Sequence, residues 1–213
     1  MSQHFDDRAG TWDDDPRRVR RAEEAAQVIR ATLPLRPGMR MLDLGAGTGL
    51  LSQALVDDVG SLVLADPSQG MRDVAERKAA SGLFGERVRV IHPDELDESA
   101  PGEFDLVVAL MALHHIEDLP TALGRLGRAL APGGLIAVVD LERDVEETFH
   151  DPGFTGHQGF DRSEIAQLLK DAGFGGVAIR HCLAMPKNDR TYDLFLATAR
   201  TPENQAGGGP SSR

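Results

Sequence analysis

Short apolar runs alternate with amphipathic stretches along most of the chain. The runs are rich in Leu, Val and Ile and are too short for buried helices, so each indicates a strand covered on both faces. The stretches between them have the spacing of helices that bury one face. The pattern predicts strands at 40–44, 62–65, 88–91, 104–110 and 135–141, and helices at 50–56, 71–80 and 119–130.

The C-terminal third predicts a different kind of connection. Asp161, Glu164 and Gly173 mark the ends of one more helix, as N-cap, capping-box partner and C-terminal glycine. The runs 177–182 and 191–199 are joined by "PKNDR", which is too short for a crossover helix and predicts a hairpin. We therefore expect an α/β fold: a Rossmann-like, seven-stranded, mostly parallel sheet with an antiparallel C-terminal hairpin and helices on both faces.

The two ends of the chain differ from its middle. The first residues show little periodicity, yet they include Phe5 and Trp12, which a disordered arm would not need. Helical spacing then begins at Arg17. We expect three parts: an N-terminal arm and helix that can act as an active-site lid (1–37), one domain (38–200), and a disordered tail rich in Gly, Pro and Ser (201–213).

Composition narrows the class of protein. A formal net charge of −11, with no basic run interleaved with aromatic residues, argues against a nucleic-acid partner. No apolar stretch approaches the length of a membrane span, and the acidic N-terminus is unlike a signal peptide, so we expect a cytoplasmic protein without a membrane partner. A lone cysteine, Cys182, rules out an internal disulfide and predicts a core position.

A glycine loop, Gly45-Ala46-Gly47-Thr48-Gly49, follows the first predicted strand. Such a loop brings backbone N–H groups and the N-terminus of the next helix toward a ligand at the strand ends. The dinucleotide fingerprint would need its third glycine at Leu50, and the lysine of a phosphate-binding loop is missing. The spacing therefore argues against NAD, FAD and nucleoside triphosphates.

Two carboxylates complete a nucleoside-like pattern. Asp66 ends the second predicted strand, where a carboxylate can accept hydrogen bonds from both hydroxyls of a ribose. Asp94 follows the third strand, where it can accept from an exocyclic amine such as that of adenine. A solvated acidic turn is the alternative interpretation of Asp94. The carboxyl ends of adjacent parallel strands bring these loops together.

The ordered motifs resemble those of class I S-adenosylmethionine-dependent methyltransferases of the small-molecule kind, similar to the ubiquinone and menaquinone enzymes. They are "MLDLGAGTGLLS", "ADPSQGM", "HPDEL", "FDLVVALMALHHIED" and "LAPGGLIAVVD". The resemblance covers residues 38–141 in motifs and extends to residue 200 in hairpin topology. It implies in-line transfer of a methyl group from S-adenosylmethionine to an O, N or C nucleophile of a small molecule, leaving S-adenosylhomocysteine.

The resemblance also implies a set of cofactor-binding residues. The glycine loop would line the methionine and ribose parts of the cofactor. Asp43 would hold its amino end, Asp66 the ribose hydroxyls and Asp94 the adenine amine. The carbonyl of Leu110 would accept from its ammonium group. Pro93 departs from the glycine that many relatives have there. The implied set is Asp43, Gly45, Ala46, Gly47, Gly49, Asp66, Pro67, Ser68, Met71, Asp94, Glu95, Leu110 and Trp12.

Three histidines are candidates for a catalytic base, which is needed only if the nucleophile arrives protonated. His114 and His115 follow the fourth strand, and His157 lies in a glycine-punctuated loop. A structural role is the alternative for each. The loop "HQGFDR" resembles the "HHGFDR" of a methyltransferase subgroup, with Gln158 in place of the second histidine. Asp140 and Glu142 are second-choice bases.

Other functions stay open at this stage. A module that binds S-adenosylmethionine without turnover is the main alternative, and a nicotinamide dehydrogenase is disfavoured by the glycine spacing. No fixed ligand spacing supports a metal site, although His150 and Asp151 lie near His157. The acceptor is not identified by the sequence. We expect a small-molecule substrate and a monomer or homodimer.

Overall fold

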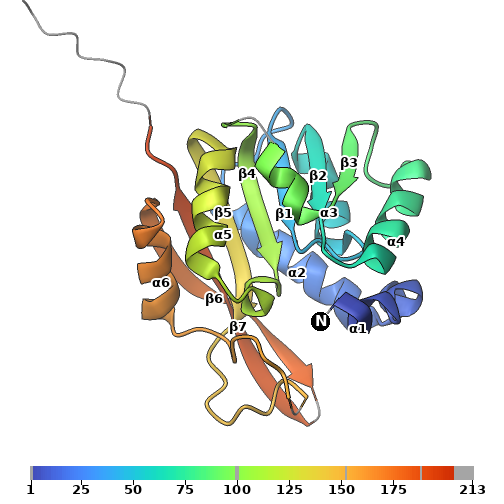
Figure 1. Ribbon diagram of the computed structural model, residues 1–213, viewed down its shortest axis with the longest axis vertical. Helices are drawn as coiled ribbons and strands as arrows, with labels where there is room; N and C mark the ends of the chain where they lie inside the picture. Colours follow the sequence, from blue (N-terminus) through green and yellow to red (C-terminus); the bar gives the residue numbers. More distant parts are fainter. Residues whose placement is uncertain (1, 99–100, 152, 188, 204–213) are drawn as a thin grey trace, which may run out of the picture.

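A single sheet of seven strands organises the computed structural model, which describes residues 2–98, 101–151, 153–187 and 189–203 (Figure 1). The strands are β1 (Arg40–Leu44), β2 (Ser61–Ala65), β3 (Val88–Ile91), β4 (Phe104–Leu110), β5 (Leu130–Leu141), β6 (Gly175–Lys187) and β7 (Arg190–Arg200). The longer helices are α2 (Pro16–Thr32), α3 (Leu50–Leu55), α4 (Gln69–Ala80), α5 (Leu119–Ala129) and α6 (Arg162–Asp171).

The strand order is β3-β2-β1-β4-β5-β7-β6. Strands β1 to β5 are parallel, whereas β7 runs antiparallel to both β5 and β6. This confirms the predicted Rossmann-like sheet with its C-terminal hairpin. The order reverses between β1 and β4, and ligands in open α/β sheets bind outside the carboxyl ends of the strands at such a switch point.

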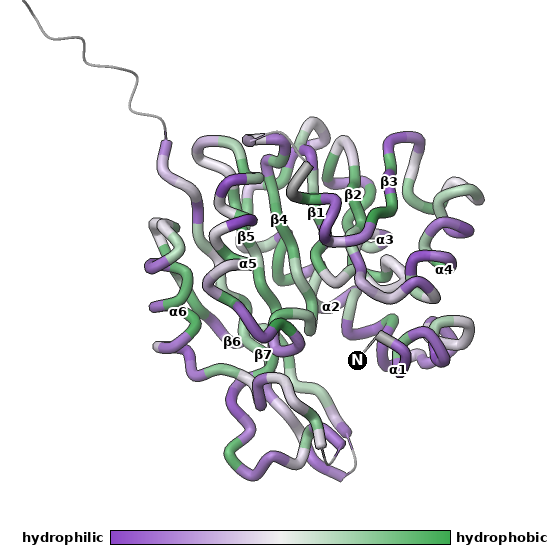
Figure 2. The backbone as a smooth tube through the Cα atoms, viewed as in Figure 1, coloured by the Kyte–Doolittle hydropathy of each residue, from purple (hydrophilic) through white to green (hydrophobic). Residues whose placement is uncertain are grey.

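Successive side chains of each strand point to opposite faces of the sheet and pack in two hydrophobic layers. Met41 of β1 packs in the layer that contains Ile29 of α2, and Leu42 packs in the opposite layer with Leu123 of α5. Figure 2 shows apolar strands inside and polar outer faces on the helices. Cys182 is buried in the first layer, as predicted, and burial raises the pKa of its thiol to about 12.

The structure corrects several predicted boundaries. β5 starts at Leu130 and includes the "APGG" that predicts a turn, because Leu130 pairs with Phe104 and Thr201 N–H bonds the Gly134 carbonyl. The two hairpin strands extend through most of "PKNDR", so the connection is tighter than expected. Most of the tail predicted to be disordered, residues 204–213, lies outside the described residues.

The N-terminal arm is structured. It forms α1 (Ser2–Asp6) and the 3-10 helix η1 (Ala9–Asp14), and α1 lies beside α4 (Figure 1). The Asp15 side chain then caps α2 by accepting from Arg17 N at 3.0 Å. Within the described ranges, no helix is both long enough and apolar enough to cross a membrane.

Candidate active site

The three glycines of the loop after β1 all have positive φ, but different neighbours require them. A Cβ on Gly45 would lie 2.4 Å from the Cβ of Ala112, and one on Gly49 would lie 2.5 Å from Cζ of Phe84. A Cβ on Gly47 would meet nothing closer than 3.9 Å. Packing within the protein therefore excludes side chains at the first and third glycines, while the middle one faces an open position.

Asp66 joins the loops after β1 and β2. Its Oδ2 accepts from Gly47 N–H at 2.8 Å, and its Oδ1 accepts from Ser68 N–H at 2.9 Å. Burial raises the pKa of this carboxyl, and the two N–H groups oppose the rise. Each carboxylate oxygen has more than one lone pair, so both can still accept a hydroxyl donor.

Asp43 in β1 is fully buried beneath the glycine loop. Its Oδ2 accepts from the Ser52 hydroxyl at 2.7 Å. Burial raises the pKa of Asp43 to about 7, and the nearby charge of Asp66 adds to the rise. A cationic group at this position would relieve that electrostatic cost.

The other predicted cofactor residues are distributed around the same strand ends. Met71 is buried near Gly47, whereas Pro67 is exposed beside Asp66. Asp94 lies in the 3-10 helix η3 (Pro93–Glu98), where its side chain is 83 % exposed and its Oδ2 lies 3.2 Å from Nδ1 of His92. In the same helix, Glu95 Oε1 accepts from His92 N–H, and Leu110 ends β4.

Asp6 in the arm is bound by the loop after β2. Its Oδ1 accepts from the Ser68 hydroxyl at 2.5 Å and from Gly70 N–H at 2.9 Å. These two hydrogen bonds lower the pKa of Asp6. The backbone fits closely there, since a Cβ on Gly70 would lie 2.9 Å from Asp6 Cα.

Asp13 fixes the second half of the arm on the glycine loop. Its two oxygens accept from the Thr48 hydroxyl at 2.5 Å and from Lys78 Nζ at 2.9 Å. Trp12 stacks under the Arg18 guanidinium and contacts Phe5, whose ring lies 5.3 Å from that of His115. The arm thus spans the loops after β1 and β2 and reaches His115.

His114 forms a buried pair with Asp140 of β5. The Nδ1 of His114 lies 2.6 Å from Oδ1 of Asp140, and Oδ2 accepts from Leu113 N–H at 2.9 Å. Burial alone would raise the pKa of Asp140, but the charge and hydrogen bond of His114 hold it below its usual value. The pair fixes the turn that follows β4.

The structure brings His115 and His157 to the same end of the sheet. His157 N–H donates to the His114 carbonyl at 2.8 Å, and its Nε2 donates to the Ile116 carbonyl at 3.1 Å. Burial lowers the pKa of His115 to about 3, so this imidazole is neutral. Its Nδ1 is buried without a partner among the described residues.

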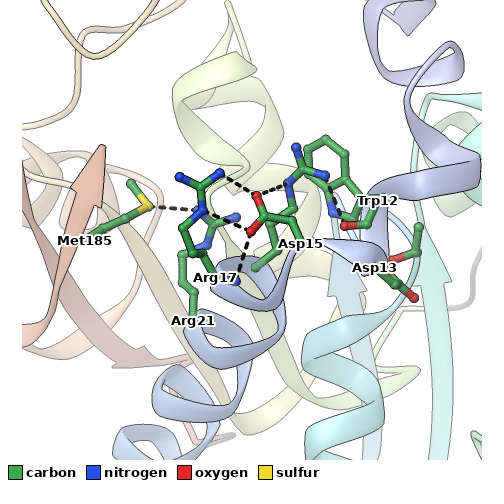
Figure 3. A network of polar contacts seen from close by, with 8 residues as sticks. Trp12, Asp13, Asp15, Arg17, Arg21 and Met185 are labelled. Carbon is green, nitrogen blue, oxygen red and sulfur yellow. Dashed lines mark hydrogen bonds and ion pairs between the residues drawn. The ribbon is translucent and has the colours of Figure 1, made fainter. Parts of the chain in front are cut away.

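Two further groups lie near this end of the sheet, and the sequence predicts no catalytic or binding role for either. His150, in the segment between β5 and α6, stacks on Phe154 with ring centroids 3.6 Å apart. Arg21 reaches from α2 to β6, where its Nη1 lies 2.8 Å from Sδ of Met185 (Figure 3). No local spacing marks either residue, because the contacts that define them come from segments distant in sequence.

The fold and the site together define an α/β protein with a nucleoside-type loop set at its switch point. The methyltransferase-domain family model matches residues 17–179. The chain belongs to this methyltransferase family.

Individual relatives agree with this assignment. The chain is 35 % identical over 158 residues to an uncharacterised methyltransferase of Schizosaccharomyces pombe, covering 67 % of the chain and 55 % of the relative. It is 36 % identical over 108 residues to a ubiquinone biosynthesis O-methyltransferase of a Bradyrhizobium species, covering 50 % and 42 %. The chain thus spans about half the length of these curated relatives.

A solved structure shows the same fold. A Haloferax volcanii methyltransferase, in complex with the Trm112 methyltransferase activator, superposes with a TM-score of 0.75 at 20 % identity, covering 93 % of the chain and 98 % of that protein. The family implies S-adenosylmethionine, and the residues present fit it. Gly47 offers an open backbone position, Asp66 offers hydroxyl acceptors, and buried Asp43 suits a cation.

Proposed function

We propose that this chain is an S-adenosylmethionine-dependent methyltransferase that acts on a small-molecule acceptor. The observation that carries the proposal is the Asp66 carboxylate, held between Gly47 N–H and Ser68 N–H at the end of β2. A carboxylate so oriented suits a ribose diol. Family membership supports the same activity, and no observation favours a module that binds without turnover.

The remaining cofactor roles are part of this proposal. Asp66 binds the ribose hydroxyls, Asp43 favours the amino end through its charge, and the Gly47 backbone approaches the cofactor. The exposed Asp94 and Glu95 serve the adenine. The surrounding contacts come from Gly45, Ala46, Gly49, Pro67, Ser68, Met71, Leu110 and Trp12.

When bound, the cofactor supplies a sulfonium methyl group that is already electrophilic. The protein then has to align the acceptor with that methyl group and exclude water. The arm suits the second task, because Asp6 and Asp13 attach it across the loops after β2 and β1. We propose that the arm is the lid of this site. The sequence predicts His114, His115 and His157 as catalytic histidines, and the low pKa of His115 argues against that residue as the base.

Calorimetry with S-adenosylhomocysteine tests the proposal. Wild-type protein is expected to bind it saturably, and Asp66→Asn is expected to weaken binding about tenfold or more, because one charged acceptor is lost. Asp73→Asn, an exposed carboxylate on α4, is the matched control and should bind as wild type does. Absence of binding, or equal affinity of wild type and Asp66→Asn, would contradict the proposal.

A further inference from the structure

Three buried nitrogen atoms have no hydrogen-bond partner in the part of the chain that the structure describes: Arg21 Nε, His115 Nδ1 and His150 Nε2. Asp140, near the carboxyl end of β5, interacts electrostatically with all three side chains. A buried polar group without a hydrogen-bond partner destabilises the folded protein. Three such groups within electrostatic range of one carboxylate therefore indicate a place for a polar ligand.

The tautomer of His150 follows from its partner. Its Nδ1 lies 2.9 Å from Oε1 of Gln158, and a carbonyl oxygen can only accept, so Nδ1 carries the hydrogen. The neutral ring therefore has its lone pair on the unpartnered Nε2. Stacking on Phe154 and an edge contact with Phe149 hold the ring in place. His150 is a neutral, oriented hydrogen-bond acceptor.

The charged groups around His150 set its basicity. Burial lowers the pKa of His150, and the positive charges of His114 and Lys187 lower it further. The hydrogen bond to Gln158 and the negative charge of Asp140 raise it. His115 also faces this ring, at 6.2 Å between centroids. With a pKa of about 3, His115 is too weak a base for efficient proton transfer near neutral pH. His150 instead presents an acceptor nitrogen that the bond to Gln158 orients.

Arg21 supplies a buried cation that Asp15 and Asp140 stabilise electrostatically, without a salt bridge to it among the described residues. Its Nη1 contacts the thioether of Met185, which is a weak acceptor (Figure 3). Its Nε has no hydrogen-bond partner in the described part of the chain. Burial lowers the pKa of Arg21 to about 10, so the group stays charged at neutral pH. Lys187, close enough to interact with Arg21, adds a second positive charge.

We propose that these groups form the acceptor site and that the acceptor is a small hydroxy acid: Arg21 binds its anionic group, and His150 accepts the proton of its hydroxyl. The hydroxyl oxygen forms the new bond to the methyl carbon as the sulfur–methyl bond breaks and its electron pair returns to sulfur. His150 Nε2 takes the hydroxyl proton and later releases it to water. The inference rests on the proposed function and makes it an O-methylation.

Binding of defined probes tests the anion part. We would titrate 2-, 3- and 4-hydroxybenzoate, and the uncharged hydroxybenzamides, into protein saturated with S-adenosylhomocysteine. Wild type is expected to bind at least one acid about tenfold more tightly than its amide, and Arg21→Met should abolish that difference. Arg20→Met, the exposed neighbour on α2, should retain it. No saturable binding of any acid, or equal binding of acid and amide, would overturn the assignment.

Nitrogen NMR of the imidazoles tests the base independently of turnover. His150 should show hydrogen on Nδ1, and Gln158→Glu should raise its pKa through a new negative charge. The nitrogen signals of the exposed His181 on β6 should be the same in both proteins. With any hydroxybenzoate that is methylated, the pH profile of kcat should shift in the same direction. Hydrogen on Nε2, or no shift in Gln158→Glu, would overturn the role of His150. If these variants bind S-adenosylhomocysteine as tightly as wild type does, a negative result contradicts the role of His150 and leaves the proposed function intact.

Discussion

At the scale of single residues, the glycine loop makes a testable contrast. Gly45→Ala would place a Cβ 2.4 Å from that of Ala112 at a φ of +68°, whereas Gly47→Ala adds a Cβ in open space at +56°. We expect Gly47→Ala to cost about 1 kcal/mol of unfolding free energy from backbone strain. Gly45→Ala should cost about 2–4 kcal/mol because overpacking adds to that strain. Urea denaturation measures both.

A double mutant separates the two causes. Ala112→Gly removes the atom that the new Cβ would meet, so it should recover part of the loss in Gly45→Ala and none of the loss in Gly47→Ala. Equal costs for the two single substitutions would show that packing against Ala112 is not what requires a glycine. Binding of S-adenosylhomocysteine should follow the opposite order, because only Gly47 faces the open position.

The positions of residues were predictable from sequence where the determinant is local. Asp66 follows an apolar run, and strand-ending carboxylates share one edge of a parallel sheet, so its position follows from the pattern. The requirement for Gly49 was not predictable, since it comes from Phe84. The contacts of Arg21 and His150 were also not predictable from sequence, because their partners lie on β6 and in the segment before α6.

At the scale of elements, the segments that bury an apolar face in the core were predicted, and the short helices of the arm were not. The five parallel strands and the longer helices match the pattern because each buries a continuous apolar face. α1 and η1 are too short to show a period. They are held instead by tertiary contacts of Asp6 and Asp13, which the sequence does not display.

The arm yields a kinetic prediction. If it is the lid of the cofactor site, Asp13→Ala removes its bonds to Thr48 and Lys78 and should raise the dissociation rate of S-adenosylhomocysteine about fivefold or more, by roughly 1 kcal/mol. Stopped-flow displacement measures the rate. Asp14→Ala, an exposed neighbour, should leave it unchanged. An unaltered rate in Asp13→Ala would mean that the arm packs on the domain without controlling release.

At the scale of the whole molecule, the sheet order divides the site. The loops after β1, β2 and β3 form the side proposed for the cofactor. The acceptor side proposed here combines the loop after β4, the segment before α6, the hairpin and α2 (Figure 1). Local motifs mark the first side, whereas long-range packing assembles the second. That difference explains why the sequence identified a donor class but no acceptor.

Asp43 connects this architecture to global stability. Its pKa of about 7 in the folded protein exceeds its ordinary value of 3.8, so the native state binds more protons than the unfolded chain between these values. The unfolding free energy contributed by this group therefore decreases as pH rises from about 4 to 7, by up to about 4 kcal/mol. Asp43→Asn should remove that decrease. The pKa of Asp140 is lowered, so this residue changes the pH dependence of the unfolding free energy in the opposite direction. Because wild type and Asp43→Asn both contain Asp140, its contribution cancels when they are compared.

Urea denaturation of wild type and Asp43→Asn at pH 5.0 and 7.5 measures the effect, with Asp73→Asn as the exposed control. The stability of the variant relative to wild type should rise between the two pH values, and that of the control should not. Saturating S-adenosylhomocysteine should reduce the difference, because its ammonium group would stabilise the ionised carboxylate. Parallel pH dependences of wild type and Asp43→Asn would show that Asp43 is not a source of the pH dependence. A difference unaffected by ligand would instead argue against the amino end of the cofactor lying near Asp43.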